Sequence, residues 1–75
     1  MKFIQLTGAT LREFVHPDEM QAHELDAAGV TDASLIRVNE QGDIEIRRRE
    51  GWDVIGGLLG DYQERLKKAT GLDWA

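Results

Sequence analysis

Apolar and polar residues alternate strictly along two short stretches near the middle of the chain. Ile36 and Val38 alternate with polar neighbours, and Ile44 and Ile46 do the same further along. A period of two places these four apolar side chains on one face of a pair of strands. The pattern therefore predicts a β-hairpin over residues 35–48.

The length of the connecting loop decides which residues of the hairpin face each other. A two-residue loop would set Val38 opposite Glu45, so an apolar and a charged side chain would share a face. A three-residue loop, Glu40 to Gly42, pairs Val38 with Ile44 and keeps both faces consistent. It also puts Gly42 at the left-handed position that such hairpins fill with glycine. We predict this register, with a positive φ and a β-bulge at Gly42.

The first third of the chain predicts one strand and two helical segments. Phe3–Leu6 is a short apolar run that can add a third strand to the hairpin, which alone would be only marginally stable in water. Thr10 and Glu13 have the spacing of a capping box, so a short helix is expected from Thr10 until Pro17 ends it. A second helix is expected from Pro17 to the residue before Gly29, which supplies a left-handed stop.

The strongest helical pattern follows the hairpin. Apolar and aromatic residues recur at steps of three and four over residues 52–69, and we expect this helix to cover the apolar face of the hairpin. Gly56, Gly57 and Gly60 stand in its first half, at a cost of about 1 kcal/mol each relative to alanine. Either the regular helix begins later, with Asp61 as its cap, or Gly56 and Gly60 form a close-packing surface for another backbone.

Together these elements predict a single small α+β domain over residues 1–75. An antiparallel sheet of two or three strands has one face covered by the C-terminal helix and is supported by the two N-terminal helical segments. Leu72 and Trp74 form an apolar pair near the end of the chain, so we expect Trp74 to dock onto the domain. A chain of 75 residues is near the lower limit for a core without disulfides, which leaves no room for a second domain.

Acidic residues are concentrated in the first half of the chain. The net charge is −5, and residues 10–35 contain six acidic side chains against one basic side chain. An acidic domain is a poor nucleic-acid ligand by default, because neutralisation of phosphates supplies most of the non-specific affinity. The chain has no cysteine, and no segment approaches the roughly 20 apolar residues of a membrane span. These features favour a cytoplasmic protein without a membrane partner.

No group of side chains predicts a catalytic or cofactor site. Cysteine is absent, and both histidines lie in the acidic segment without a nucleophile placed beside them. Glu19, His23 and Asp26 fall on one face of a helix, but such a group on one surface helix is more often a solvated face than a metal site. We therefore predict a protein that is not an enzyme and binds no metal or cofactor.

The densest basic feature is the run Arg47-Arg48-Arg49, and Arg37 lies on the facing strand of the hairpin. These four arginines are candidate contacts for phosphate or for an acidic partner, or they protect the edge of a strand with charge. The first function that we predict is a non-catalytic interaction or assembly module that binds an unidentified protein or a second copy of itself. The second is a small nucleic-acid-binding domain that uses the arginine-rich hairpin.

Residues 38–46, Val-Asn-Glu-Gln-Gly-Asp-Ile-Glu-Ile, resemble the hairpin pattern of the SpoVT-AbrB transition-regulator family. That pattern is valine, Asn or Asp, Glu, any residue, Gly, any residue, and Ile or Val. The resemblance implies hairpins that interleave in a DNA-binding dimer. It covers nine residues, and the chain departs from the pattern at Arg47, where the arginine run stands in place of a proline that usually follows soon after.

Overall fold

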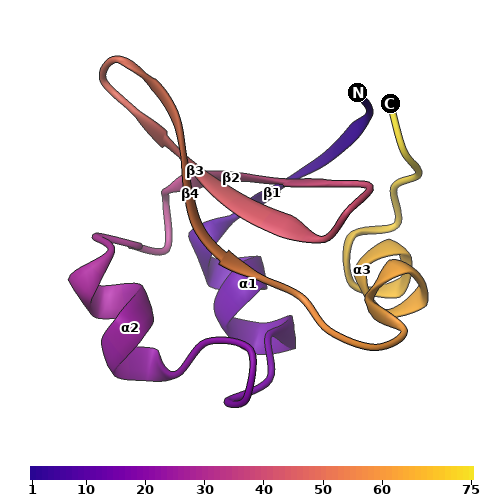
Figure 1. The fold of residues 1–75 in the computed structure, drawn as a ribbon, viewed down its shortest axis with the longest axis horizontal. Helices are drawn as coiled ribbons and strands as arrows, with labels where there is room; N and C mark the ends of the chain where they lie inside the picture. The colour runs from indigo at the N-terminus through magenta and orange to yellow at the C-terminus, as the bar shows by residue number, and fades with distance from the viewer.

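All 75 residues are described in the computed structural model, which contains a four-stranded antiparallel sheet and three helices (Figure 1). Along the chain the elements are β1 Phe3–Thr7, α1 Gly8–Phe14, α2 Ala22–Ala27, β2 Leu35–Asn39, β3 Asp43–Arg48, β4 Gly51–Gly57 and α3 Tyr62–Thr70. The strands lie in the sheet in the same order as in the chain. The predicted α+β class is confirmed, with one strand more than expected.

The central hairpin has the predicted register. Ile36 pairs with Ile46, and Val38 pairs with Ile44 across β2 and β3. All four side chains are at most 3% exposed. Gly42 has a φ of +88°, and its amide closes the loop with a hydrogen bond of 2.9 Å to the carbonyl of the last residue of β2. The period-two pattern and the loop length were therefore sufficient to predict this part of the sheet.

Both outer edges of the hairpin are paired with other strands of the same chain. The predicted strand at the N-terminus exists as β1 and pairs with β2, and β4 pairs with β3. The interleaved hairpins implied by the family resemblance are therefore not formed in this chain. The edge strands of the sheet are instead β1 and β4.

The C-terminal residues dock along the edge of β1. The Phe3 amide donates to the Ala75 carbonyl at 2.9 Å, and the Ala75 amide donates to the Phe3 carbonyl at 3.0 Å. Trp74 is half-buried and packs against the core, as predicted. Leu72 remains 50% exposed, so the docking depends on Trp74 rather than on the apolar pair.

The prediction of a helix over residues 52–69 is wrong in its first half. Residues 51–57 form β4, and α3 begins only at Tyr62, after Asp61 at its N-cap position. The later start was one of the two alternatives drawn from the glycines, although the Asp61 carboxylate makes no capping hydrogen bond.

The spacing of the apolar residues in β4, which also contains a β-bulge, explains why the strand looked helical. Val54 and Gly56 pair with neighbouring residues of β3, which leaves Ile55 as the extra residue of the bulge. Trp52 lies on the side of the sheet away from the core, where it contacts Arg37, whereas Ile55 packs against the core. Two apolar residues three apart in one strand therefore face opposite sides of the sheet. A step of three is the spacing of a helix, and it hid the strand.

The first helix begins two residues earlier than predicted, and its cap lies three residues earlier. Gly8 is its first residue, and Thr7 is the N-cap, whose hydroxyl accepts a hydrogen bond from the Thr10 amide at 3.2 Å. The predicted capping box of Thr10 and Glu13 is therefore wrong. The prediction of a threonine cap was correct in residue type, but Thr7 and Thr10 stand three residues apart and the helix uses the earlier one.

The second helix is shorter than predicted. Pro17 lies in a turn, and α2 spans only Ala22–Ala27, because Gln21 and Glu24 form a capping box at its start. The Gln21 amide donates to Glu24 Oε1 at 3.0 Å. The predicted left-handed stop at Gly29 is confirmed by its φ of +82°.

All three helices pack on the same face of the sheet. One buried leucine from each helix, Leu11 of α1, Leu25 of α2 and Leu66 of α3, joins the inner-face residues of the sheet in one core. Helix α1 lies against β1, β2 and α3, so it shares with α3 the role predicted for the C-terminal helix alone. In Figure 1 α1 and α2 lie below the sheet and α3 lies near its right-hand end. None of the helices combines the length and the apolar character needed to cross a bilayer.

Candidate functional site

The face of the sheet opposite the helices, here called the outer face, is organised around Arg37. The guanidinium carbon of Arg37 lies 3.8 Å from the centre of the Phe3 ring and 4.3 Å from that of the Trp52 ring. Its Nη2 donates to Glu45 Oε1 at 3.1 Å. Such stacking of a cation on aromatic rings contributes about 0.5–2 kcal/mol per contact. We call Phe3, Arg37, Glu45 and Trp52 the Arg37 cluster.

The strand register brings the Arg37 cluster together. Arg37 and Glu45 are directly paired across β2 and β3. Phe3 comes from β1, two pairs further along the sheet and on the same face, and Trp52 comes from β4, so two rings from the edge strands reach over the central ion pair. Glu45 is buried as a result, and Arg37 Nε has no hydrogen-bond partner. Ring stacking and the ion pair therefore hold Arg37 against its neighbours in one packed group.

The structure does not gather the four candidate arginines into one patch. Arg37 is held in its cluster, and Arg47 is exposed beside it, with its guanidinium carbon 5.9 Å from the centre of the same tryptophan ring. Arg48 lies on the helical side and its Nε donates to Asp53 Oδ2 at 3.2 Å. Arg49 is exposed in the turn between β3 and β4. Only Arg37 and Arg47 share a surface.

The two candidate close-packing glycines also lie apart. Gly56 is in β4, and an added Cβ would lie 2.7 Å from Met20 Sδ, so this space is filled from within the chain. Gly60 is exposed with a φ of +65°, and an added Cβ would meet nothing within 4 Å. A helix would have placed these two residues, four apart, on one surface, but β4 and a loop replace that part of the predicted helix.

The outer face also has exposed apolar residues that sequence reasoning missed. Val54 is 59% exposed and Leu35 is 58% exposed. Val54 pairs with Glu45 and therefore lies next to the Arg37 cluster. The alternation of Trp52, Asp53 and Val54 is the signal that would have identified this strand, but it spans only three residues before the bulge.

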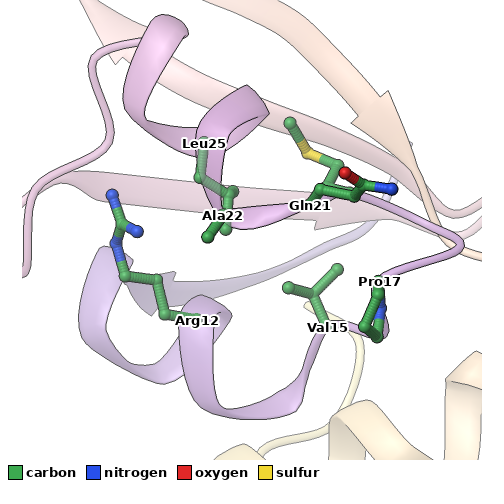
Figure 2. Close-up of a pocket in the computed structure, with 7 residues that line it drawn as sticks. Arg12, Val15, Pro17, Gln21, Ala22 and Leu25 are labelled. Atoms are coloured by element: carbon green, nitrogen blue, oxygen red, sulfur yellow. The ribbon is translucent and has the colours of Figure 1, made fainter.

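A pocket of about 350 Å³ lies between α1 and α2 in the helical layer (Figure 2). Its lining is mostly apolar and consists of Arg12, Val15, Pro17, Met20, Gln21, Ala22 and Leu25. Figure 2 shows Arg12 and Pro17 at opposite ends of this space. The Arg12 guanidinium is already bound, since Nη2 donates to Asp26 Oδ1 and to the Val30 carbonyl, both at 2.6 Å.

A buried carboxylate joins the turn before α2 to the segment before α3. The Glu19 side chain is 1% exposed and accepts hydrogen bonds from the His16 amide at 2.8 Å, the Leu59 amide at 2.7 Å and Arg65 Nη2 at 2.5 Å. Burial raises the pKa of Glu19, but the hydrogen bond from Arg65, followed by those from the two amides, outweighs burial and lowers the pKa below its ordinary value of 4.5. We call this arrangement of Glu19 with its three donors the clasp, because it holds the turn before α2 against α3 and the segment before it.

The clasp also separates the three residues considered for a metal. Glu19 lies outside α2 and faces Arg65, whereas Asp26 lies in α2 and pairs with Arg12. No group of three side chains of the usual metal-binding types comes together in the structure. The helical spacing that grouped Glu19 with His23 and Asp26 required a longer helix than the chain forms.

No protein-family model, curated protein or solved structure is significantly similar to this chain. The likeness of residues 38–46 to the SpoVT-AbrB hairpin therefore stays a local one. Function has to be inferred from the chemistry of the surfaces described above.

Proposed function

We propose that this domain is a non-catalytic module that binds a partner protein through the outer face of its sheet. The observation that supports the proposal is that all three helices pack on one side of the sheet, which leaves the Arg37 cluster and Val54 on the other side without a cover. Aromatic and arginine side chains held in a fixed arrangement contribute a large share of the binding energy at protein interfaces.

The charges on the outer face indicate the chemistry of the partner. The charge of Arg37 is balanced by Glu45, whereas Arg47 forms no ion pair. A complementary surface would place a carboxylate near Arg47 and an apolar side chain over Val54 and Trp52. The partner that we propose is therefore a protein with an acidic and apolar patch.

The test compares the native domain with a variant that changes only the outer face. The double substitution Arg47→Glu and Val54→Glu reverses the free cation and adds charge to the apolar site, and Glu64→Lys on the exposed side of α3 is the matched control. We expect the native domain and the control to retain the same protein from a cell lysate, or to self-associate in light scattering, and the double variant to do neither. The proposal fails if the native domain does neither, or if the double variant behaves like it.

A second candidate function is binding of single-stranded nucleic acid. The observation that favours it is the combination of two aromatic rings with Arg37 and Arg47 on an open antiparallel sheet, since such surfaces stack bases and contact phosphates. The net charge of −5 opposes this function.

A titration with a labelled single-stranded oligonucleotide at low salt tests the second candidate. Binding should weaken steeply as salt is added and should be reduced more by Arg47→Glu than by Arg48→Glu, because Arg48 is paired with Asp53. Absence of binding at low salt removes this candidate and leaves the first one unaffected.

A further inference from the structure

The pocket between α1 and α2 is a second candidate binding surface, and the function proposed for the outer face does not use it. Its floor is formed by Met20 and Leu25, which are buried core residues. Figure 2 shows Val15 of the segment after α1 on one side and Ala22 and Leu25 of α2 on the other, with the space between them open. A volume of about 350 Å³ is sufficient for an aromatic or branched side chain that reaches the core from outside.

The pocket offers no free charge to an occupant. Arg12 is the one ionisable residue of the lining, and both its ion pair with Asp26 and its hydrogen bond to the Val30 carbonyl are short. A charged group in the pocket would have to displace Asp26 or lose its water without compensation. The group that fits the pocket is therefore apolar.

The surroundings of the pocket are acidic. Four exposed carboxylates stand on α1, on α2 and in the turn between them: Glu13, Asp18, Glu24 and Asp26. Asp26 is paired with Arg12 and Glu24 accepts from the Gln21 amide, whereas Glu13 and Asp18 make no such contact. Arg12 is the only lysine or arginine over residues 8–28. This charge would favour a cationic partner and repel an acidic one.

The backbone around the pocket restricts the shape of the partner. Four of the seven lining residues lie in the segment between α1 and α2, and the backbone amides of the lining are largely bonded within the chain. The amides of Val15, Met20 and Leu25 donate to backbone carbonyls, and the Gln21 amide donates to Glu24 Oε1. No row of free backbone amides is present to pair with an extended peptide, so a partner whose own backbone is internally bonded fits better. An amphipathic helix has this property and presents its apolar side chains on one stripe.

We propose that the groove between α1 and α2 binds a basic amphipathic helix of a partner protein, with one apolar side chain in the pocket and lysine or arginine side chains against the carboxylates. This site goes beyond the proposed function, because it lies in the helical layer and takes a partner of opposite charge. The domain can then hold two partners, one on each side of its sheet.

The test uses a labelled helical peptide of alanine and lysine with a single phenylalanine, titrated into the full chain by fluorescence anisotropy. We expect binding that weakens by about tenfold or more when the phenylalanine is replaced by alanine, and that weakens with added salt. Ala22→Trp fills the pocket and should reduce binding by a similar factor. Ala27→Trp adds the same bulk on an exposed position of the same helix and should leave binding unchanged.

Three results would overturn the proposal. The first is no binding up to about 1 mM peptide, the weak end of specific association. The second is binding that depends on lysine but is indifferent to phenylalanine and to Ala22→Trp, which would show attraction by charge alone. The third is self-association of the native chain that Ala22→Trp abolishes, which would assign the groove to a second copy. Circular dichroism of both tryptophan variants verifies that they remain folded.

Discussion

Two separate constraints act on the single residue Gly42. Its φ of +88° lies in the left-handed region that side chains avoid, and an added Cβ would lie 3.0 Å from Tyr62 Cζ. The Tyr62 hydroxyl donates to the Glu40 carbonyl at 2.7 Å, which holds the ring in place. The first constraint was predictable from the length of the loop. The second depends on where α3 meets the hairpin, and no local pattern encodes that contact.

Substitution of Gly42 separates strain from crowding. Gly42→Val is expected to lower the free energy of unfolding by about 2 kcal/mol or more, because it adds both backbone strain and a clash with Tyr62. Gly60→Val is the control, since Gly60 has a φ of +65° but an added Cβ there would meet nothing within 4 Å. This variant should lower the free energy of unfolding by only about 1 kcal/mol. Urea denaturation measures both. Equal losses would show that Tyr62 does not restrict this position.

The clasp at Glu19 predicts a loss of stability that depends on pH. Glu19→Gln is expected to lower the free energy of unfolding by about 1–3 kcal/mol at pH 7, because three donors lose an ionised acceptor. The pKa of Glu19 is lowered in the folded state, so its contribution is complete above the ordinary value of 4.5 and is lost as the pH falls through the lowered value. Urea denaturation of both proteins over a pH series should show the gap closing in acid. A gap that stays constant with pH would contradict this assignment.

Among the elements, β4 shows which part of the candidate site could be predicted. The hairpin pattern placed Arg37 and Arg47 on one face, and the structure confirms that they share it. The partners of Arg37 could not be found, because Trp52 belongs to a strand that the three-residue step from Trp52 to Ile55 made to look helical, and Phe3 is assigned to the same face only by the register of β1 with β2. Pairing between strands distant in sequence is decided by the packed core, which short-range spacing does not report.

The junction between β1 and α1 predicts a substitution that the fold should not tolerate. The Gly8 amide donates to the Ser34 carbonyl at 2.9 Å, and an added Cβ would lie 1.8 Å from the Thr31 carbonyl oxygen. Gly8→Ala is therefore expected to cost about 2–4 kcal/mol, because the backbone of the loop before β2 would have to move. Gly57→Ala is the control, since its nearest atom would be 3.9 Å away, and it should change stability by less than about 1 kcal/mol. A native melting temperature for Gly8→Ala would contradict this close approach.

For the whole molecule, the main result is that helices cover one side of the sheet and leave the other side open. The acidic character of residues 10–35 was evident from the sequence, and these residues include α1 and α2 in the helical layer. The sequence did not predict that the opposite side of the sheet is open, because this depends on all three helices packing on the same face. With the outer face and the groove on opposite sides, variants of one surface should not alter binding at the other.

The docking of the C-terminal residues predicts how the two ends of the chain stabilise the whole domain. Trp74→Ala should lower the free energy of unfolding by about 1–3 kcal/mol, because a half-buried ring is lost from the core. It should also speed hydrogen exchange at the Phe3 amide, which donates to Ala75. Leu72→Ala is the control and should change neither quantity much, since Leu72 is 50% exposed. Unchanged exchange at Phe3 in the Trp74 variant would show that the edge pairing holds without the ring.

The two hydrogen bonds between Phe3 and Ala75 bring residues 1 and 75 out of the domain side by side (Figure 1). A short peptide can therefore link them, and new termini can be opened in the exposed turn at Arg49 and Glu50, which gives a circular permutant with the same sheet. For the same reason the domain can be inserted into a surface loop of another protein. The host chain would leave the insert close to where it entered, and its own fold would be little disturbed.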